Sequence, residues 1–247
     1  IKAAHLGITG DVSEVLQALL PKVQPTLRKR WLSHVAGLKA AHPLQTPGID
    51  DPRTHYGLIS AVAAALNDEA TISTDVGQHQ MWVSQAYPLR RPRQWLTSGG
   101  LGTMGFGVPA AIGAALAEPQ RTVVCFSGDG SILMNIQELV TAAEEGANVK
   151  IVLMNNATLG LVHQQQTLFY GERIYASKFK AMPDFIKVAE GFGIRAVDLD
   201  QAEQPRAALA DALNTPGPCL IHASIDMHEK VYPMVPPGAS NKEMIGG

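Results

Sequence analysis

The sequence of 247 residues is poor in charge, in cysteine and in aromatic side chains. It holds 20 basic and 22 acidic residues, so its net charge is −2, and no basic run is visible. A nearly neutral chain lacks the positive surface that neutralises nucleic-acid phosphates, so we expect no nucleic-acid partner. Charged residues make up 17% of the chain, against about 25% in typical domains, which indicates that other protein covers part of the surface.

Cysteine is almost absent: there are two, Cys125 and Cys219, and each lies inside an apolar run. We interpret both as small buried thiols of a reducing compartment rather than as a disulfide or a metal site, and we expect a cytoplasmic protein. The chain opens with IKAAHLGITGD, which lacks the charged segment and the long apolar stretch of a secretory signal. It also lacks an initiator Met, so we expect a piece of a longer protein.

One stretch is long enough to cross a bilayer, because no charged residue occurs from Gln94 to Ala117. Seven of its residues, however, are Gly or Pro. We therefore interpret it as a glycine-rich loop that leads into a buried helix, and we expect no contact with a membrane. Hydrophobic residues make up 46% of the whole chain, which excludes disorder as its main state.

After residue 55, strand-like and helix-like segments alternate, and this pattern is typical of βαβ units. We therefore predict an α/β fold: a parallel sheet with helices on both faces. The expected strands are Ala70–Thr74, Thr122–Phe126, Val149–Met154, Ile194–Val197 and Cys219–Ile225. The expected helices are Asp11–Leu20, Tyr56–Leu66, Phe106–Ala117, one capped by Asn135 and Glu138, one starting at Pro183 and ending at Gly191, and one from a capping box of Asp200 and Glu203 to about Leu213.

The chain divides into three parts by composition. We interpret residues 1–54, which are punctuated by prolines, as the end of a preceding domain plus a linker. Residues 55–230 form the predicted α/β domain. Residues 231–247 are rich in Pro and Gly, so we expect an irregular C-terminal tail or a flap.

Polar clusters follow three of the predicted strands, where ligands bind in parallel sheets. They are Asp75–His79, Gly128–Ser131 and the pair Asn155-Asn156. The second cluster combines glycines, which let backbone N–H groups approach an anion, with the carboxylate of Asp129. A carboxylate beside a phosphate requires a cation between them, which indicates Mg²⁺, and an amide oxygen from Asn156 is a suitable further ligand.

Here the residues resemble a known family. Gly128-Asp129-Gly130, followed after 24 residues by Asn155-Asn156, is similar to the thiamine-diphosphate motif. The segments DVGQHQMW, RQWLTSGGLGTMGFGVPAAIGAA, FSGDGSILMNIQEL and VYPMVPPG resemble the catalytic subunit of acetolactate synthase (acetohydroxyacid synthase). LGLVHQQQTLFY is similar to the bacterial isozyme I type. The resemblance runs through nearly the whole chain but covers only the last part of that subunit.

The resemblance implies thiamine diphosphate and Mg²⁺ as cofactors. Asp129 and Asn156 would bind Mg²⁺ through side chains, and Thr158 through its carbonyl oxygen. Gly102 would accept a hydrogen bond from the cofactor's amino group, and Met104 would prop the cofactor in a bent shape; these two are the expected catalytic residues. The expected cofactor-binding residues are Val76, Gly77, Gln78, His79, Gly102, Met104, Gly128, Asp129, Gly130, Ser131, Asn156, Gly160 and Leu161.

The resemblance further implies that the parent enzyme condenses pyruvate with a second 2-oxo acid, with loss of CO₂, in branched-chain amino acid biosynthesis. It implies a homodimer or tetramer formed through the cofactor site, and a small regulatory subunit as a candidate partner. Flavin binding (FAD), which the biosynthetic members have, would depend on residues outside this chain. The family also takes an essential glutamate from its N-terminal domain, so we predict that this chain alone has no synthase activity.

Three alternatives stay open. The chain could belong to another thiamine-diphosphate-dependent carboligase or decarboxylase, or it could be a non-catalytic docking module. A nicotinamide-binding domain is the third, because Gly100, Gly102 and Gly105 have the G-x-G-x-x-G order, but no predicted strand precedes them. Finally, Gln165 stands where many plant and fungal members have an aromatic residue, which would change what fits in the substrate channel. His163, Gln164 and Gln166 are either substrate contacts or a polar helix face, and we favour the helix face.

Overall fold

The computed structural model describes residues 3–67 and 69–246, and the chain divides after Pro43 into two compact units. The first unit holds the helices α1 (Val12–Leu19) and α2 (Lys29–Ala41) and the short 3-10 helix η1 (Leu20–Lys22). Asp11 caps α1 as predicted, since its Oδ1 accepts hydrogen bonds from the N–H groups of Ser13 and Glu14. No residue of these three helices is buried.

Helix α2 is absent from the sequence prediction, which interpreted that proline-punctuated stretch as a linker. The prolines flank the helix rather than interrupt it, because Pro25 and Pro43 lie outside its bounds. Most apolar side chains of the three helices are exposed, for example Trp31 of α2 with 61% of its surface and Leu20 of η1 with 70%. The first unit therefore has no buried core of its own among its described residues.

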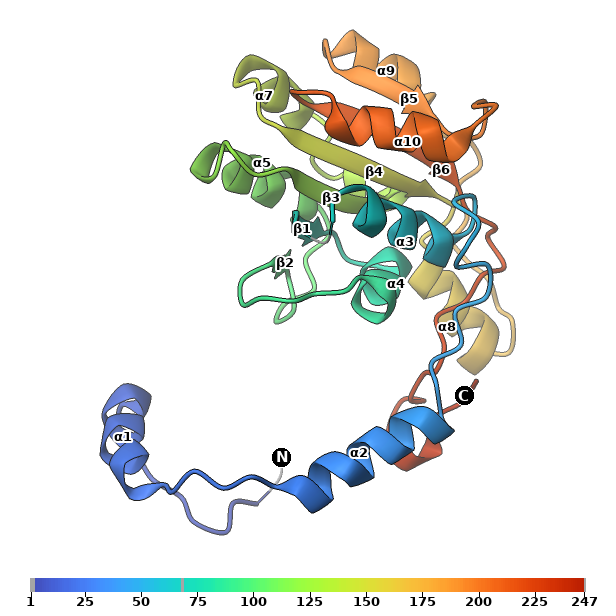
Figure 1. Ribbon diagram of the computed structural model, residues 1–247. Coiled ribbons are helices and arrows are strands. Elements are labelled where there is room, and N and C mark those ends of the chain that lie inside the picture. The colour runs from blue at the N-terminus through green and yellow to red at the C-terminus, as the bar shows by residue number, and fades with distance from the viewer. Residues whose placement is uncertain (1–2, 68, 247) are drawn as a thin grey trace. The chain divides into compact units, whose positions relative to one another are not determined.

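The second unit confirms the predicted α/β fold, because its described residues form a six-stranded, all-parallel sheet. The strand order across the sheet is β2-β1-β3-β4-β6-β5 (Figure 1). The strands are β1 (Thr71–Thr74), β2 (Trp95–Thr97), β3 (Val123–Gly128), β4 (Val149–Asn155), β5 (Arg195–Asp198) and β6 (Cys219–Ser224). The helices are α3 (His55–Ala65), α4 (Gln78–Ala86), α5 (Gly107–Ala117), α6 (Asp129–Ile132), α7 (Glu138–Glu144), α8 (Gly160–Phe169), α9 (Phe185–Gly191) and α10 (Pro205–Asn214).

Both faces of the sheet are covered, which explains why the central strands are continuous apolar runs. Along β3 the side chains alternate: Val124 and Phe126 pack into a core with α3, α4 and α10, whereas Val123 and Cys125 pack into a second core with α5, α7 and α9. Cys125 and Cys219 are both buried free thiols, as predicted. No helix in the described part of the chain is long and apolar enough to span a membrane.

Strand β2 contradicts the expectation that no strand precedes Gly100. It is a three-residue edge strand inside the uncharged stretch, too short to give an alternating pattern. Two of the predicted helix starts are also wrong. Asn135 does not cap α7, because its Nδ2 donates to the carbonyl of Gly105. Asp200 does not cap α10, because its carboxylate accepts from the N–H of Ser224.

Helix α9 starts later than predicted. Its N-cap is Asp184, whose Oδ1 accepts from the N–H of Lys187, so Pro183 lies outside the helix. The C-terminal tail, residues 231–247, is mostly irregular as expected. It nevertheless contains one short 3-10 helix, η2 (Asn241–Glu243), because Ser240 and Glu243 form a capping box there.

Candidate functional site

Three strands end beside one another at the carboxyl edge of the sheet, and a helix begins shortly after each. Helix α4 begins at Gln78 after β1, α6 at Asp129 after β3, and α8 at Gly160 after β4. None of the three helices has a side-chain N-cap. The N–H groups of a first helical turn have no partner within the helix, and the helix dipole is positive there, so such an arrangement favours an anion.

The first residues of these helices line one cavity of 160 Å³. A water needs about 10–15 Å³ of such volume, so the cavity can hold a ligand much larger than a water molecule. Every cofactor-binding and metal-binding residue proposed from the sequence lines it, from Val76 on one strand end to Leu161 on α8. Four residues that line the cavity were not predicted from the sequence: Trp82, Met154, Leu159 and Val162. Each is a sequence neighbour of a polar cluster, but an apolar side chain gives no chemical signal of its own.

Asp129 is the buried acid of the cavity, with 2% of its surface exposed. Its Oδ1 accepts from the N–H of Gly130 at 2.6 Å, and its Oδ2 accepts from the N–H of Asn156 at 3.0 Å. Burial raises the pKa of this carboxyl to about 6, although the backbone N–H groups of residues 130 and 156–158 act in the opposite direction. A cation bound at Asp129 would offset the cost of burying its charge.

Asn156 connects the cluster at Asp75–His79 with the cluster at Gly128–Ser131, because it bonds both Gln78 and Asp129. Its Nδ2 donates to Oε1 of Gln78 at 3.1 Å, while its Oδ1 accepts from the N–H of Thr158 at 3.2 Å and from the Thr158 hydroxyl at 2.9 Å. If a metal ion bound Oδ1 of Asn156, the hydroxyl hydrogen of Thr158 would have to rotate towards another acceptor. Thr158 is itself buried, and its backbone forms a bridge with Lys178.

His79 provides an unpaired polar atom at the cavity. The side chain is buried, and its Nε2 has no hydrogen-bond partner among the described residues. Burial lowers the pKa of the imidazole to about 4, with the nearby charge of Asp75 opposing the shift, so the ring is neutral at pH 7. A buried polar atom without a partner requires an explanation, and a ligand in the cavity would supply the missing hydrogen bond.

The glycines of the cavity leave space that a side chain would fill. A Cβ at Gly130 would lie 2.5 Å from Cδ2 of Leu159 and 3.6 Å from the methyl group of Met104. Met104 thus lies near the start of α6. Gly102 has φ +67°, a left-handed conformation that costs other residues energy, and a Cβ there would meet nothing within 4 Å.

Asp75 belongs to the same edge but has a structural role. Its Oδ1 accepts from the N–H groups of Val76 and Gly105, and its Oδ2 accepts from the N–H of Gly107 at the start of α5. The side chain is fully buried. Asp75 therefore fixes the loop that carries Gly102 and Met104 against the end of β1.

A second group of side chains, Asp198, Asp200 and His222, has the spacing of a metal site. The hydrogen bonds indicate another role. Oδ1 of Asn155 accepts from the N–H of Ala157, so its Nδ2 must face Nε2 of His222, at 3.0 Å. Nε2 is then the acceptor and Nδ1 carries the proton, which it donates to Asp198 at 3.0 Å. A protonated Nδ1 is no metal ligand, so we interpret this group as a support for the turn after β4.

The N–H groups at the three helix starts would suit an anion, and the buried carboxylate of Asp129 and the amide oxygen of Asn156 would suit a cation beside it. The fold and this site are those of an α/β cofactor-binding domain. Comparison with known proteins gives the class: residues 75–223 match the family described as thiamine pyrophosphate enzyme, C-terminal TPP binding domain. The chain belongs to this family, and the nicotinamide alternative is set aside.

The individual relatives of the chain are acetolactate synthases, as the sequence resemblance predicted. The chain is 58% identical over 246 residues to the acetolactate synthase isozyme 1 large subunit of Escherichia coli K12, covering 100% of this chain and 44% of that protein. It is 44% identical over 246 residues to the isozyme 2 large subunit of the same organism, with 99% and 44% covered. Acetolactate synthase 1 of Nicotiana tabacum is 40% identical over 257 residues, with 99% and 38% covered. The chain thus spans less than half the length of these relatives.

Proposed function

We propose that this chain is the diphosphate-binding part of an acetolactate synthase that depends on thiamine diphosphate and Mg²⁺. The parent enzyme would condense pyruvate with a second 2-oxo acid, pyruvate or 2-oxobutanoate, with loss of CO₂, in branched-chain amino acid biosynthesis. The observation that carries the proposal is the convergence of three helix N-termini on one cavity that also holds the buried Asp129. The identities of 58% and 44% to two acetolactate synthase large subunits support the choice of reaction.

The residues of the cavity divide the work of holding the cofactor. Asp129, Asn156 and Thr158 would bind Mg²⁺ through oxygen atoms, which this ion prefers. Gly130 and Gly160 lie in the first turns of α6 and α8, whose N–H groups would bind the diphosphate. The remaining predicted lining residues, grouped here, complete the diphosphate pocket: Val76, Gly77, Gln78, His79, Gly128, Ser131 and Leu161.

When bound, thiamine diphosphate supplies the nucleophilic carbon and the electron sink for decarboxylating a 2-oxo acid. The chain supplies orientation: Met104 would support the cofactor in a bent shape, and the carbonyl of Gly102 would accept a hydrogen bond from its amino group. Asp75 holds both residues in place through the N–H groups of Gly105 and Gly107. Correct placement of reacting groups can contribute about 7–11 kcal/mol to a barrier.

Further parts of the proposal concern the parent enzyme. Residues 1–54 would be the end of a preceding domain plus a linker, residues 55–230 the cofactor domain, and residues 231–247 a tail or flap. A homodimer or tetramer would cover the cofactor site, which fits the exposure of Leu101, beside Gly102, and of Val162, a cavity residue. A small regulatory subunit, FAD bound outside this chain and a cytoplasmic location complete the proposal.

Calorimetric titration of the 247-residue chain with thiamine diphosphate, with and without Mg²⁺, tests the binding. We expect weak binding that requires Mg²⁺, and a loss of at least about tenfold in affinity for Asp129→Asn, since this change removes the charged metal ligand. Asp50→Asn, which removes the same charge from an exposed position outside the cavity, is the control. Binding that is independent of Mg²⁺, or equal in both variants, would contradict the proposal.

The same chain should not turn over pyruvate, because the resemblance places an essential glutamate in a domain that this chain does not contain. Measured CO₂ release at a rate above that of free cofactor would refute this part. Mg²⁺-dependent binding also separates the proposal from a non-catalytic docking module, which has no need to retain Asp129 and Asn156. A full-length relative with this chain as its last part would distinguish a synthase from another carboligase or a decarboxylase by its products.

A further inference from the structure

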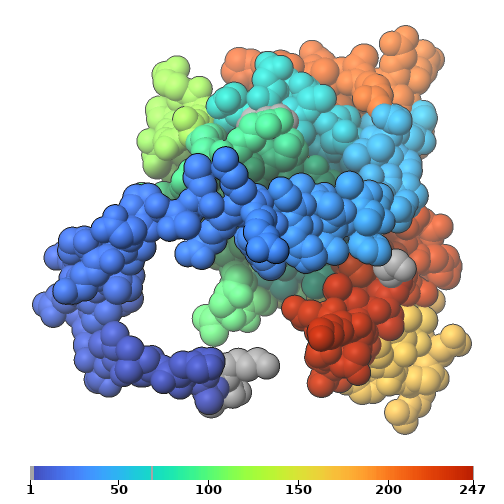
Figure 2. All heavy atoms as spheres, turned by 60° about the horizontal axis from the view of Figure 1, so that its bottom comes forward, coloured from blue at the N-terminus to red at the C-terminus, as the bar shows by residue number. Residues whose placement is uncertain are grey.

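Gln164 lies on α8 with only 1% of its surface exposed, so the polar helix face predicted for His163, Gln164 and Gln166 is buried at this position. Its side-chain amide pairs with the main chain of Val231, at the beginning of the tail. Oε1 accepts from the N–H of Val231 at 2.8 Å, and Nε2 donates to the carbonyl of Val231 at 3.0 Å. Figures 1 and 2 both show the tail, in red, beside the segment that holds α8, in yellow.

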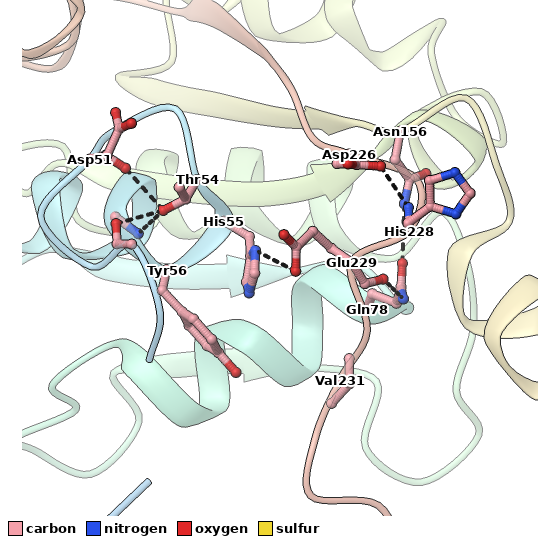
Figure 3. A network of polar contacts seen from close by, with 12 residues as sticks. Asp51, Thr54, His55, Tyr56, Gln78, Asn156, Asp226, His228, Glu229 and Val231 are labelled. Atoms are coloured by element: carbon pink, nitrogen blue, oxygen red, sulfur yellow. Dashed lines mark hydrogen bonds and ion pairs between the residues drawn. The ribbon is translucent and has the colours of Figure 1, made fainter. Parts of the chain in front are cut away.

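The side-chain amide of Gln78 is hydrogen-bonded to that of Gln164. Its Nε2 donates to Oε1 of Gln164 at 3.0 Å and to the carbonyl of Glu229 at 2.9 Å, so both of its donors are engaged. Its Oε1 consequently points to the Nδ2 of Asn156, at 3.1 Å. Figure 3 shows Gln78 between Glu229 and Asn156.

These bonds fix the polarity of three side-chain amides in succession. A main-chain N–H can only donate and a carbonyl can only accept, so Val231 determines which end of the Gln164 amide is the oxygen. Gln164, together with the carbonyl of Glu229, fixes the orientation of Gln78. Gln78, together with the N–H of Thr158, fixes that of Asn156. As a result the NH₂ group of Asn156 faces Gln78, and its Oδ1 is left on the side of Thr158.

We propose that Gln164 is a positioning residue that, through Gln78, presents the oxygen rather than the nitrogen of the Asn156 side chain to the metal ion. This inference rests on the proposed function, because Asn156 is a metal ligand only there. An amide nitrogen carries no lone pair for a cation, so a reversed Asn156 would lose one ligand. The tail from Val231 onwards thereby acts on the metal site without touching it.

Two substitutions separate positioning from packing. Gln164→Met keeps the length and nearly the volume of the side chain but removes all its hydrogen bonds to Val231 and Gln78. We expect it to weaken Mg²⁺-dependent binding of thiamine diphosphate about tenfold, the lower end of the range for a direct partner of a metal ligand, because Gln164 reaches Asn156 only through Gln78. Gln164→Glu keeps oxygens that accept from Val231 N–H and Gln78 Nε2, so its affinity should stay within about threefold of the unchanged chain, although its thermal midpoint should fall. Gln120→Leu, at an exposed loop position, is the control.

Binding is measured by calorimetry at a temperature at which every variant is folded, so that a loss of stability alone does not change the affinity. Equal affinities for Gln164→Met and the unchanged chain, or a weaker Gln164→Glu than Gln164→Met, would overturn the inference. A second measurement needs no cofactor and uses ¹⁵N spectra of the chain alone. The side-chain NH₂ signals of Gln78 and Asn156 should change position in Gln164→Met and keep their positions in Gln120→Leu. Unshifted signals would equally overturn it.

The two readouts also separate this inference from the proposed function. If the unchanged chain binds no cofactor with Mg²⁺, the proposed function fails, whereas the NH₂ signals still decide whether Gln164 orients Gln78 and Asn156. If the unchanged chain binds but Gln164→Met binds equally well, only the positioning role fails.

Discussion

Gly160→Ala tests the geometry of the cavity most directly, because the structure predicts a sign opposite to that of helix propensity. Gly160 is the first residue of α8, and alanine is a better helix former than glycine by about 1 kcal/mol. A Cβ at this position, however, would overlap Oε1 of Gln78 and lie 2.8 Å from Nδ2 of Asn156. Gln78 cannot simply move away, since its amide is held by Gln164 and by the carbonyl of Glu229.

The magnitude follows from the bonds that must break. Moving Gln78 removes its hydrogen bond with Asn156 and strains at least one of its two others, and each buried polar group left without a partner costs about 1–3 kcal/mol. After the gain in helix propensity is subtracted, we expect the free energy of unfolding to fall by about 1–2 kcal/mol. Thiamine diphosphate should also bind more weakly, because the displaced atoms line the cavity.

The control is Gly113→Ala in the interior of α5. A Cβ there meets nothing within 4 Å, and the position is exposed, so only the propensity term remains. Gly113→Ala should therefore raise the free energy of unfolding by up to about 1 kcal/mol. Urea denaturation of both variants and of the unchanged chain measures the difference. If Gly160→Ala were as stable as Gly113→Ala and bound the cofactor normally, the described packing of Gln78 against α8 would be wrong.

Two further predictions concern buried ionisable side chains. The side chain of His55 is 3% exposed, and burial lowers the pKa of its imidazole from 6.5 to about 4. Between these two pH values the unfolded chain binds more protons than the folded chain. The free energy of unfolding therefore rises with pH through this window, by about 3 kcal/mol. In His55→Phe, urea denaturation at pH 4.5 and pH 7 should show this part of the pH dependence removed, and an unchanged dependence would contradict the assigned burial. In Asp75→Asn, an NH₂ group replaces one of the oxygens that accept from Gly105 and Gly107, so the free energy of unfolding should fall by about 2–3 kcal/mol; a urea midpoint equal to that of the unchanged chain would show that these bonds do not hold the loop.

Most of the fold could be predicted because the central strands carry strong local signals. β3, β4 and β6 are covered on both faces, so each is a continuous apolar run that the sequence displays directly. β2 could not be predicted in this way, since a three-residue edge strand receives its order from pairing with β1. The wrong capping residues have a similar cause: Asn135 and Asp200 bond to groups that the sequence places 30 and 24 residues away.

The sequence by itself determined which residues have the chemistry for a cation-bridged anion and that they lie at strand ends. Parallel strands bring their carboxyl ends to one edge, so Asp75, Asp129 and Asn156 had to converge if the strands were right. Only the tertiary structure decided what each side chain does there. Whether a carboxylate or an amide supports a loop or faces a cavity depends on contacts between segments such as α8 and Val231, which lie 67 residues apart and share no local pattern.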